Sequence, residues 1–346
     1  MLYLTPFLLA CTLSVFLTAV FLWATRHLRW YTRRASRRHI HNKKISRLGG
    51  VIIIVAFLAT LFLDPHLLFS QTLWGVIVAT VGILLIGMWD DFYELDWRTQ
   101  LFFQIVLVIF LFVIGVRVEY ITNPLGGMLI LSVGHYLLPS FLFVVAWMLL
   151  MMNAMNWLDG VDGLSGGVTV IGALTIFFLS LFPEVHQQPV GIITMALAGA
   201  VFGFLIFNFH PARIFAGSAG SLFMGFMLGV LAIFAGTKIA TALLVMAIPV
   251  MDALWVVCAR LRAGKSIFQP DQRHLHFKLL ALGWSQRRVA LFFYTLTGGI
   301  AFIALNTRAI GKSVTILTVG LLMIFVLVYT ERKVQEKKVH HGTKKP

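Results

Sequence analysis

The stretch TLWGVIVATVGILLIGMWDD at residues 72–91 combines the two features that decide the fold. Residues 72–89 are almost entirely apolar, and they are followed directly by Asp90 and Asp91. A helix of about 20 apolar residues is long enough to cross a bilayer. Carboxylates beside such a helix are costly in lipid and usually mark a functional site. The stretch therefore predicts a membrane-spanning helix that ends in a functional acidic pair.

The whole chain has the composition of a polytopic membrane protein. Of its 346 residues, 59% are hydrophobic and 12% are charged, and the mean hydropathy is +0.90. These values lie outside the range of a soluble domain with one core. We expect an all-α integral membrane protein with about eleven transmembrane helices in a single domain, residues 1–346. The expected spans are 2–25, 48–63, 72–89, 99–116, 137–156, 167–182, 189–207, 221–236, 240–258, 289–306 and 313–330.

Positive charge separates the two sides of the predicted membrane domain. If residues 26–47 are cytoplasmic, the segments on that side hold 24 of the 28 Lys and Arg, including the basic tail 331–346. The positive-inside rule then predicts an external N-terminus and a cytoplasmic C-terminus. The net charge of +15 suits anionic headgroups or a phosphorylated substrate. A nucleic-acid partner is not expected, because the basic clusters lie next to the membrane.

A small external hairpin is expected between Arg117 and His135. Two short apolar runs there flank Pro124, Gly126 and Gly127. Proline and glycine between two short apolar runs are typical of a β-turn that joins two strands.

The Asp90–Asp91 pair needs something to offset its own repulsion. Adjacent carboxylates at the rim of a bilayer call for a cation, an Arg or Lys, or a proton. The alternative is a solvated helix end, although acids at a helix C-terminus oppose the helix dipole.

A second polar block, NAMNWLDGVDGL at residues 153–164, follows the fifth expected span. It places Asn153, Asn156, Asp159 and Asp162 at steps of three, so each polar residue neighbours the next on a helical surface. Amide and carboxylate oxygens beside a glycine-rich turn can hold Mg²⁺ and let a diphosphate approach closely. Ordinary Asp-Gly turns and helix-packing Asn residues are the alternative.

Two later segments on the same predicted face could bind phosphate. Residues 216–221, AGSAGS, precede a span, and free N–H groups at a helix N-terminus attract anions. Such small residues serve close helix packing equally well. In the basic loop that follows, His274 and His276 lie two residues apart, which favours an extended loop over a helix. With Arg273 they could neutralise phosphates, and an anchor for acidic lipid is the alternative for the other basic residues.

In their order, these blocks resemble the polyprenyl-phosphate N-acetylhexosamine-1-phosphate transferase superfamily, glycosyltransferase family 4, over about residues 37–288. The His-Leu-His form of the last block is closer to the WecA and TagO branch than to the MraY branch. The resemblance rests on the Arg-rich stretch with His41 before RLGG at 47–50, on Asp90–Asp91 with Gln104, on the block 153–164, on Asn208 with PARIF at 211–215, on Pro249 with Asp252, and on DQRHLH at 271–276.

The resemblance implies a reaction. A polyprenyl phosphate, such as undecaprenyl phosphate, attacks the β-phosphate of a UDP-N-acetylhexosamine, with N-acetylglucosamine the expected sugar, and UMP leaves. This is the first membrane step of a cell-surface glycan such as O-antigen or teichoic acid. The resemblance also implies Mg²⁺ as cofactor, with Mn²⁺ as the alternative, a homodimer, and an active site on the cytoplasmic side of a bacterial inner membrane.

It implies roles for residues as well. The expected active face consists of segments 26–47, 90–98, 153–166, 208–221 and 259–288. The expected catalytic residues are Asp90, Asp91, Asp159 and Asp162. The expected substrate-binding residues are Asn153, Asn156, Asn208, Arg273, His274, His276 and His41. The expected metal ligands are Asp90, Asp91, Asn156 and Asp159.

The chain departs from the family pattern at one important position. Ser218 stands where the family has an Asp that is regarded as a principal Mg²⁺ ligand, and a hydroxyl is a poorer ligand for a hard divalent ion. His39, Ser46 and Phe277 are lesser departures. A catalytically silent homologue that binds UDP-sugar or lipid phosphate is therefore one alternative. An ion-coupled transporter is another, but the sequence lacks the inverted repeats and broken helices that this class needs.

Overall fold

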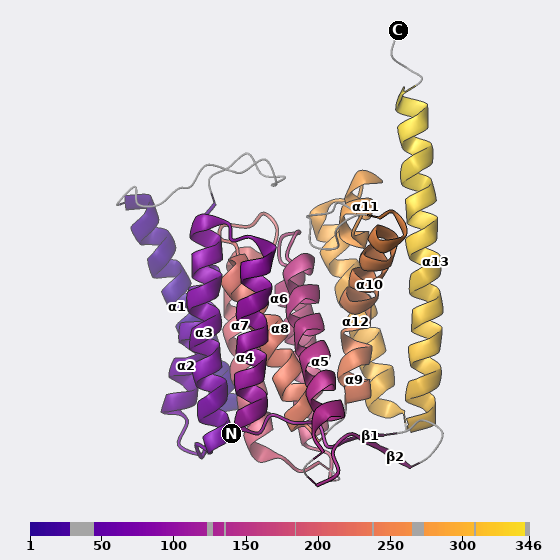
Figure 1. The fold of residues 1–346 in the computed structure, drawn as a ribbon. Coiled ribbons are helices and arrows are strands. Elements are labelled where there is room, and N and C mark those ends of the chain that lie inside the picture. The colour runs from indigo at the N-terminus through magenta and orange to yellow at the C-terminus, as the bar shows by residue number, and fades with distance from the viewer. Residues whose placement is uncertain are drawn as a thin grey trace.

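Apolar helices make up most of the computed structural model, which describes residues 1–27, 45–122, 127–134, 136–183, 185–236, 239–264, 273–307 and 309–342. Figure 1 shows them as a bundle in which most helices run roughly side by side. The helices are α1 (Leu4–His27), α2 (Gly49–Leu63), α3 (Gln71–Tyr93), α4 (Trp97–Ile114), α5 (Leu138–Leu158), α6 (Leu164–Ser180), α7 (Gln188–Asn208), α8 (Gly217–Phe234), α9 (Ile239–Val245), α10 (Ala247–Arg262), α11 (Leu275–Ala281), α12 (Gln286–Asn306) and α13 (Ala309–Gly342).

The chain is an all-α polytopic membrane protein. Within the described residues, eight helices are long and apolar enough to cross a membrane, and the count is nine if α9 and α10, bent by 76°, form one span. The expected count of eleven is not confirmed. Ten of the eleven expected segments are single helices, although α2 and α6 have only 15 and 17 residues. The segment expected at 240–258 is broken into α9 and α10, so the expectation that no helix is broken is wrong. Short helices are tolerated at membrane depth where neighbouring helices bury their ends.

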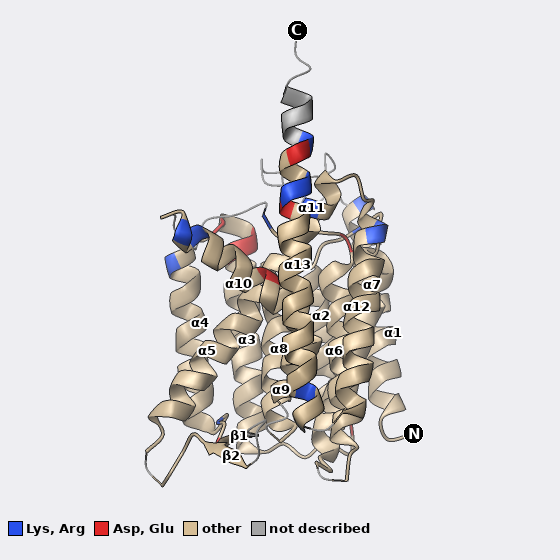
Figure 2. Cartoon of the chain, turned by 90° about the vertical axis from the view of Figure 1, so that its right-hand side faces the viewer, with Lys and Arg blue, Asp and Glu red and all other residues tan. Residues whose placement is uncertain are grey.

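The expected hairpin is confirmed. Strands β1 (Tyr120–Thr122) and β2 (Met128–Ile130) pair antiparallel, with Tyr120 opposite Ile130. The hairpin lies at one end of the bundle, and α11 lies at the other end (Figure 1). Figure 2 shows most of the Lys, Arg, Asp and Glu residues at the α11 end, where α13 extends beyond the other helices.

Helix α8 forms the centre of the bundle. Within the membrane-length window of this helix, 89% of the residues are buried, compared with 17% for α1 and for α13. Small residues allow other helices to approach it closely. A Cβ atom on Gly50 of α2 would lie 2.2 Å from the Gly220 nitrogen, and one on Gly87 of α3 would lie 2.3 Å from Ala219 Cα. The AGSAGS segment at residues 216–221 therefore allows close helix packing, which was one of the two roles expected for it.

Helix α13 is joined to the short helix α11 by polar contacts. Lys278 of α11 is only 5% exposed, and its Nζ lies 3.3 Å from Glu331 Oε2 of α13. Lys337 Nζ donates to the Ala281 carbonyl at the end of α11 over 2.9 Å. The C-terminal helix thus holds α11 against the bundle.

Replacing Gly50 by Ala tests the close packing around α8. The added methyl would overlap the α8 backbone, and we expect a loss of stability of about 3 kcal/mol or more, because overpacking a filled core forces backbone shifts. The measurement is thermal unfolding in detergent, followed by the loss of the monodisperse species. Gly320→Ala is the matched control, since nothing lies within 4 Å of its added Cβ. A Gly50→Ala protein that melts with wild type would contradict this packing.

Candidate active site

Polar segments from distant parts of the chain meet around the N-terminus of α8. The chain before α2 pairs with the chain before α8 through backbone hydrogen bonds: Phe215 N donates to Ser46 O over 2.9 Å, and Gly50 N donates to Ala216 O over 2.8 Å. This pairing fixes the start of α2, and with it Arg47, beside the start of α8.

The Asp91 carboxylate caps α8 from the end of α3. Its Oδ1 accepts a hydrogen bond from Ser218 N at 2.9 Å, and its Oδ2 accepts one from Ala219 N at 3.2 Å. A negative charge at a helix N-terminus is favourable because the first N–H groups have no partner within the helix. The α8 terminus is thus a true anion site, and here the anion at these two amides is Asp91.

Asp90 points elsewhere. Its Oδ1 accepts a hydrogen bond from Leu95 N at 2.8 Å, so it closes the turn after α3. Backbone N–H groups therefore hold both members of the acidic pair, each in a different direction. Because the two carboxylates point in different directions, the repulsion expected between them is reduced.

The two Asn residues of the second polar block face different helices. Asn153 Nδ2 donates to Gln104 Oε1 of α4 over 2.8 Å. Asn156 Oδ1 accepts a hydrogen bond from Ser221 Oγ of α8 at 2.8 Å. Asn156 therefore lies at the α8 terminus with Asp91, whereas Asn153 joins α5 to α4.

Asp159 follows the last residue of α5 and accepts a hydrogen bond from Ser165 Oγ. Burial raises the pKa of its carboxyl to about 7, and the charges of Asp91 and Asp162 raise that pKa further, while Ser165 and Arg47 lower it. Three carboxylates thus act on one another here. A cation would be favoured at such a place, since positive charge stabilises the ionised form of the carboxyl.

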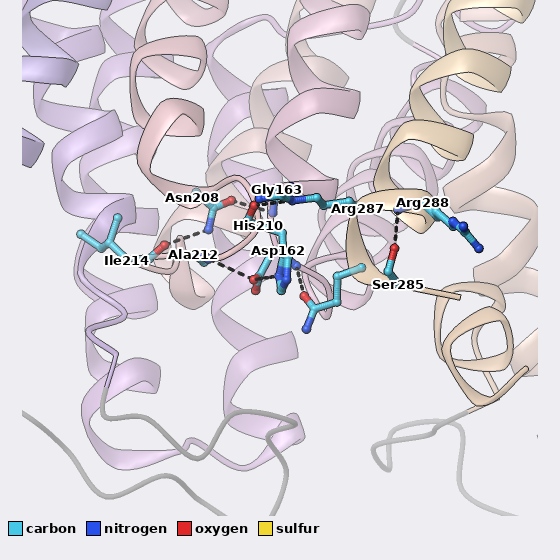
Figure 3. A network of polar contacts seen from close by, with 10 residues as sticks. Asp162, Gly163, Asn208, His210, Ala212, Ile214, Ser285, Arg287 and Arg288 are labelled. Atoms are coloured by element: carbon cyan, nitrogen blue, oxygen red, sulfur yellow. Dashed lines mark hydrogen bonds and ion pairs between the residues drawn. The ribbon is translucent and has the colours of Figure 1, made fainter. Parts of the chain in front are cut away.

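Asp162 and Asn208 form hydrogen bonds between the segment before α8 and the turn between α5 and α6 (Figure 3). Asp162 is 2% exposed, and its Oδ2 lies 2.7 Å from His210 Nδ1 and 3.0 Å from Ala212 N. Asn208 accepts a hydrogen bond from Gly163 N at 3.1 Å and donates to the Ile214 carbonyl over 2.8 Å. Both side chains therefore hold the segment before α8 against the turn between α5 and α6.

Sequence reasoning missed three residues of α12 that support the same turn. Asp162 N donates to Gln286 Oε1 over 3.1 Å, Arg287 Nε donates to the His210 carbonyl over 3.0 Å, and Tyr294 donates its hydroxyl proton to the Gly163 carbonyl. These three residues belong to no recognisable motif, so their contacts could not be predicted from the sequence.

The expected extended loop around the two histidines is wrong. His274 is the N-cap residue of α11, and His276 lies in the first turn of that helix. Their rings nevertheless stack, with centroids 5.6 Å apart and planes 6° from parallel. The reason is that the His274 backbone is extended, with φ −60° and ψ 146°, so its side chain does not follow the helical rotation.

His276 is fully buried against the turn that follows Asp159. A Cβ on Gly160 would lie 2.8 Å from His276 Nε2. Burial lowers the pKa of His276 to about 3, so its ring is uncharged near neutral pH and cannot neutralise a phosphate by charge. The half-buried Arg273 directly precedes the pair, and His41 lies outside the described residues.

The residues expected to hold Mg²⁺ provide part of a metal site. In the portion of the chain that the structure describes, no group of three or more His, Cys, Asp or Glu side chains is placed to hold a metal ion. Proteins commonly hold Mg²⁺ through one or two carboxylates together with phosphate oxygens of a substrate. Asp91 and Asp159 offer carboxylate oxygens that fit that partial role. Ser218 offers a hydroxyl where the resemblance leads one to expect a carboxylate.

Comparison with known proteins decides the family. Residues 73–236 match the model of glycosyl transferase family 4. A decaprenyl-phosphate N-acetylglucosaminephosphotransferase of Mycobacterium leprae is 35% identical over 303 residues, covering 78% of this chain and 75% of that protein. The chain belongs to glycosyl transferase family 4. The resemblance drawn from its motifs is therefore confirmed.

Two further relatives show a similar degree of identity. A Bacillus subtilis protein named "Probable undecaprenyl-phosphate N-acetylglucosaminyl 1-phosphate transferase" is 29% identical, over 85% of this chain and 80% of that protein. A phospho-N-acetylmuramoyl-pentapeptide-transferase of Moorella thermoacetica is 32% identical, over 75% of this chain and 83% of that protein. The region matched by the family model contains Asp91, Asp159 and the start of α8.

Asp162→Ala tests whether this buried carboxylate holds the two loops together. The change leaves the part-buried donors of His210 and Ala212 without their acceptor, and we expect a loss of about 1 to 3 kcal/mol. A lower midpoint of thermal unfolding would show it. Glu336→Gln removes only an exposed pair with Lys333 and should stay within about 0.5 kcal/mol of wild type. Equal midpoints for the two variants would show that the Asp162 contacts carry no stability.

Proposed function

We propose that the protein transfers N-acetylhexosamine 1-phosphate, with N-acetylglucosamine as the sugar, from a UDP-sugar to a polyprenyl phosphate such as undecaprenyl phosphate. Membership of the family and the names of its relatives support this reaction class. The observation that carries the proposal is the meeting of Asp91, Asn156 and Asp159 beside the α8 terminus, next to the turn that packs against the histidine-bearing helix α11.

The proposed chemistry is a single displacement at phosphorus. An oxygen of the lipid phosphate forms a bond to the β-phosphorus of the donor, and the bond from that phosphorus to the bridging oxygen breaks, so that UMP leaves. A phosphate monoester is largely ionised near neutral pH and therefore needs little help from a base. Positioning and neutralisation of charge are the main requirements of phosphoryl transfer.

Mg²⁺ is the proposed cofactor, with Mn²⁺ as the alternative. Asp91 and Asp159 would contribute carboxylate oxygens to it, and Asn156 an amide oxygen. When bound, the ion would neutralise negative charge on the diphosphate oxygens. The family resemblance adds Asp90 to this set, and Asp90 could also act as a base toward the lipid phosphate.

The proposed site faces the cytoplasm of a bacterium. The excess of Lys and Arg in the segments on that side supports this orientation, with the N-terminus outside. A homodimer and the first membrane step of a surface glycan are further parts of the proposal, and both rest on the family resemblance. A second candidate function, binding of UDP-sugar or lipid phosphate without turnover, follows from Ser218.

UMP release from a panel of UDP-sugars with undecaprenyl phosphate tests the transfer. We expect wild type to release UMP from UDP-N-acetylglucosamine and Asp159→Asn to lower kcat by about 100-fold, in line with the loss of one electrostatic stabilising group. Glu336→Gln, far from these residues, should match wild type. Unchanged turnover in Asp159→Asn would refute the role of that residue.

Ser218→Asp distinguishes the two candidate functions. If wild type binds UDP-N-acetylglucosamine but releases no UMP at high Mg²⁺, and Ser218→Asp releases it, the protein is the silent homologue. If wild type binds neither the nucleotide sugar nor undecaprenyl phosphate and releases no UMP, both candidate functions are refuted.

A further inference from the structure

Asp252 is a buried carboxylate that the proposed chemistry does not use. It lies on α10 and is 3% exposed. Its Oδ2 is 2.9 Å from His274 Nδ1, and its Oδ1 accepts a hydrogen bond from Leu275 N at 2.8 Å. One side chain from another helix therefore caps α11 and also holds the ring of the residue before it.

The contact with Asp252 distinguishes the two nitrogens of the His274 ring. A carboxylate oxygen can only accept, so Nδ1 must carry the proton in this bond. Nε2 forms no hydrogen bond with any residue in the described part of the chain. His276 differs, since neither of its ring nitrogens has a described partner.

The His274 ring lies beside the turn that carries Asp159. Its centroid is 5.8 Å from the ring of Trp157, which lies two residues before Asp159 on α5. The ring of His274 also stacks on that of His276, and the Nε2 atom of His276 lies against Gly160 of the same turn. A phosphate bound near Asp159 would therefore be close to the unused nitrogen of His274.

We propose that Asp252 is a positioning residue that fixes His274 for binding of the donor diphosphate. This inference rests on the proposed function and adds to it the group that orients the histidine. A phosphate oxygen at Nε2 and the Asp252 carboxylate at Nδ1 both accept hydrogen bonds, so the bound ring donates on both sides. In metal sites, an outer carboxylate of this kind commonly fixes the orientation of the ligating histidine, and the same geometry would orient a histidine toward a phosphate.

A double-mutant cycle between Asp252 and His274 tests the proposal. The affinity for UDP-N-acetylglucosamine is measured by calorimetry for wild type, Asp252→Asn, His274→Gln and the double variant. We expect Asp252→Asn to weaken binding about tenfold, as loss of an outer-shell partner typically does. In the His274→Gln background the same change should have almost no effect, because Asp252 then has no ring to position. An equal loss in both backgrounds would overturn the proposal.

Asp252→Glu and Asp64→Asn complete the experiment. The Glu variant keeps the charge and should recover most of the affinity that Asn loses. If Asp252→Asn does not fold, the cycle is run with Asp252→Ser, which removes the carboxylate and should weaken binding only when His274 is present. Asp64 is a matched control, because it is 7% exposed and accepts a hydrogen bond from His66 N at the C-terminal end of α2, away from α11. Asp64→Asn should bind the donor as wild type does.

The protonation of the ring provides a readout that is independent of turnover. In protein labelled with ¹⁵N-histidine, the signal assigned by its loss in His274→Gln should show a protonated Nδ1, and Asp252→Asn should shift it. An unshifted signal would overturn the proposal. If wild type binds the donor but releases no UMP, the proposed transfer fails while the binding cycle still decides the role of Asp252. Wild type that does not bind the donor overturns both.

Discussion

The contact between the Asp91 carboxylate and the first amides of α8 is the interaction on which the site depends. Helix α8 is buried along its length, so its N-terminus lies inside the bundle, where unpaired N–H groups would be costly. Asp91 satisfies two of them from the end of α3. The same contact brings a carboxylate to the point where Asn156 meets Ser221. The Asp91 side chain thus caps a buried helix and also forms part of the proposed site.

Close packing and buried charge oppose each other at this end of the bundle. Glycines at the start of α2 and near the end of α3 allow backbones to approach α8, and the Asp91 carboxylate there is only 5% exposed. Burial raises the pKa of Asp159, and the neighbouring carboxylates raise it further. A substrate that arrives with a divalent cation would relieve this repulsion. With Ser218 in place of a third carboxylate, the protein itself contributes less negative charge to that cation.

Much of the fold could be predicted from the sequence because apolar length is a local property. Ten of the eleven expected segments are single helices, whereas the break between α9 and α10 and the short lengths of α2 and α6 leave no mark in the apolar pattern. The family motifs predicted that Asp91, Asn156 and Asp159 belong together. The contacts of Asp162 with His210 and of Gly163 with Tyr294 join residues far apart in the chain, and no local pattern reveals them. The helix that begins at Leu275 was missed because Asp252, on another helix, supplies its cap.

The link between α11 and α13 has a practical consequence for handling this protein. Lys278 is buried and paired with Glu331, and Lys337 binds the last carbonyl of α11. Helix α13 is therefore tied to the helix that carries His276. A truncation before Glu331 would remove both contacts, so shortened recombinant forms should retain α13 through Lys337.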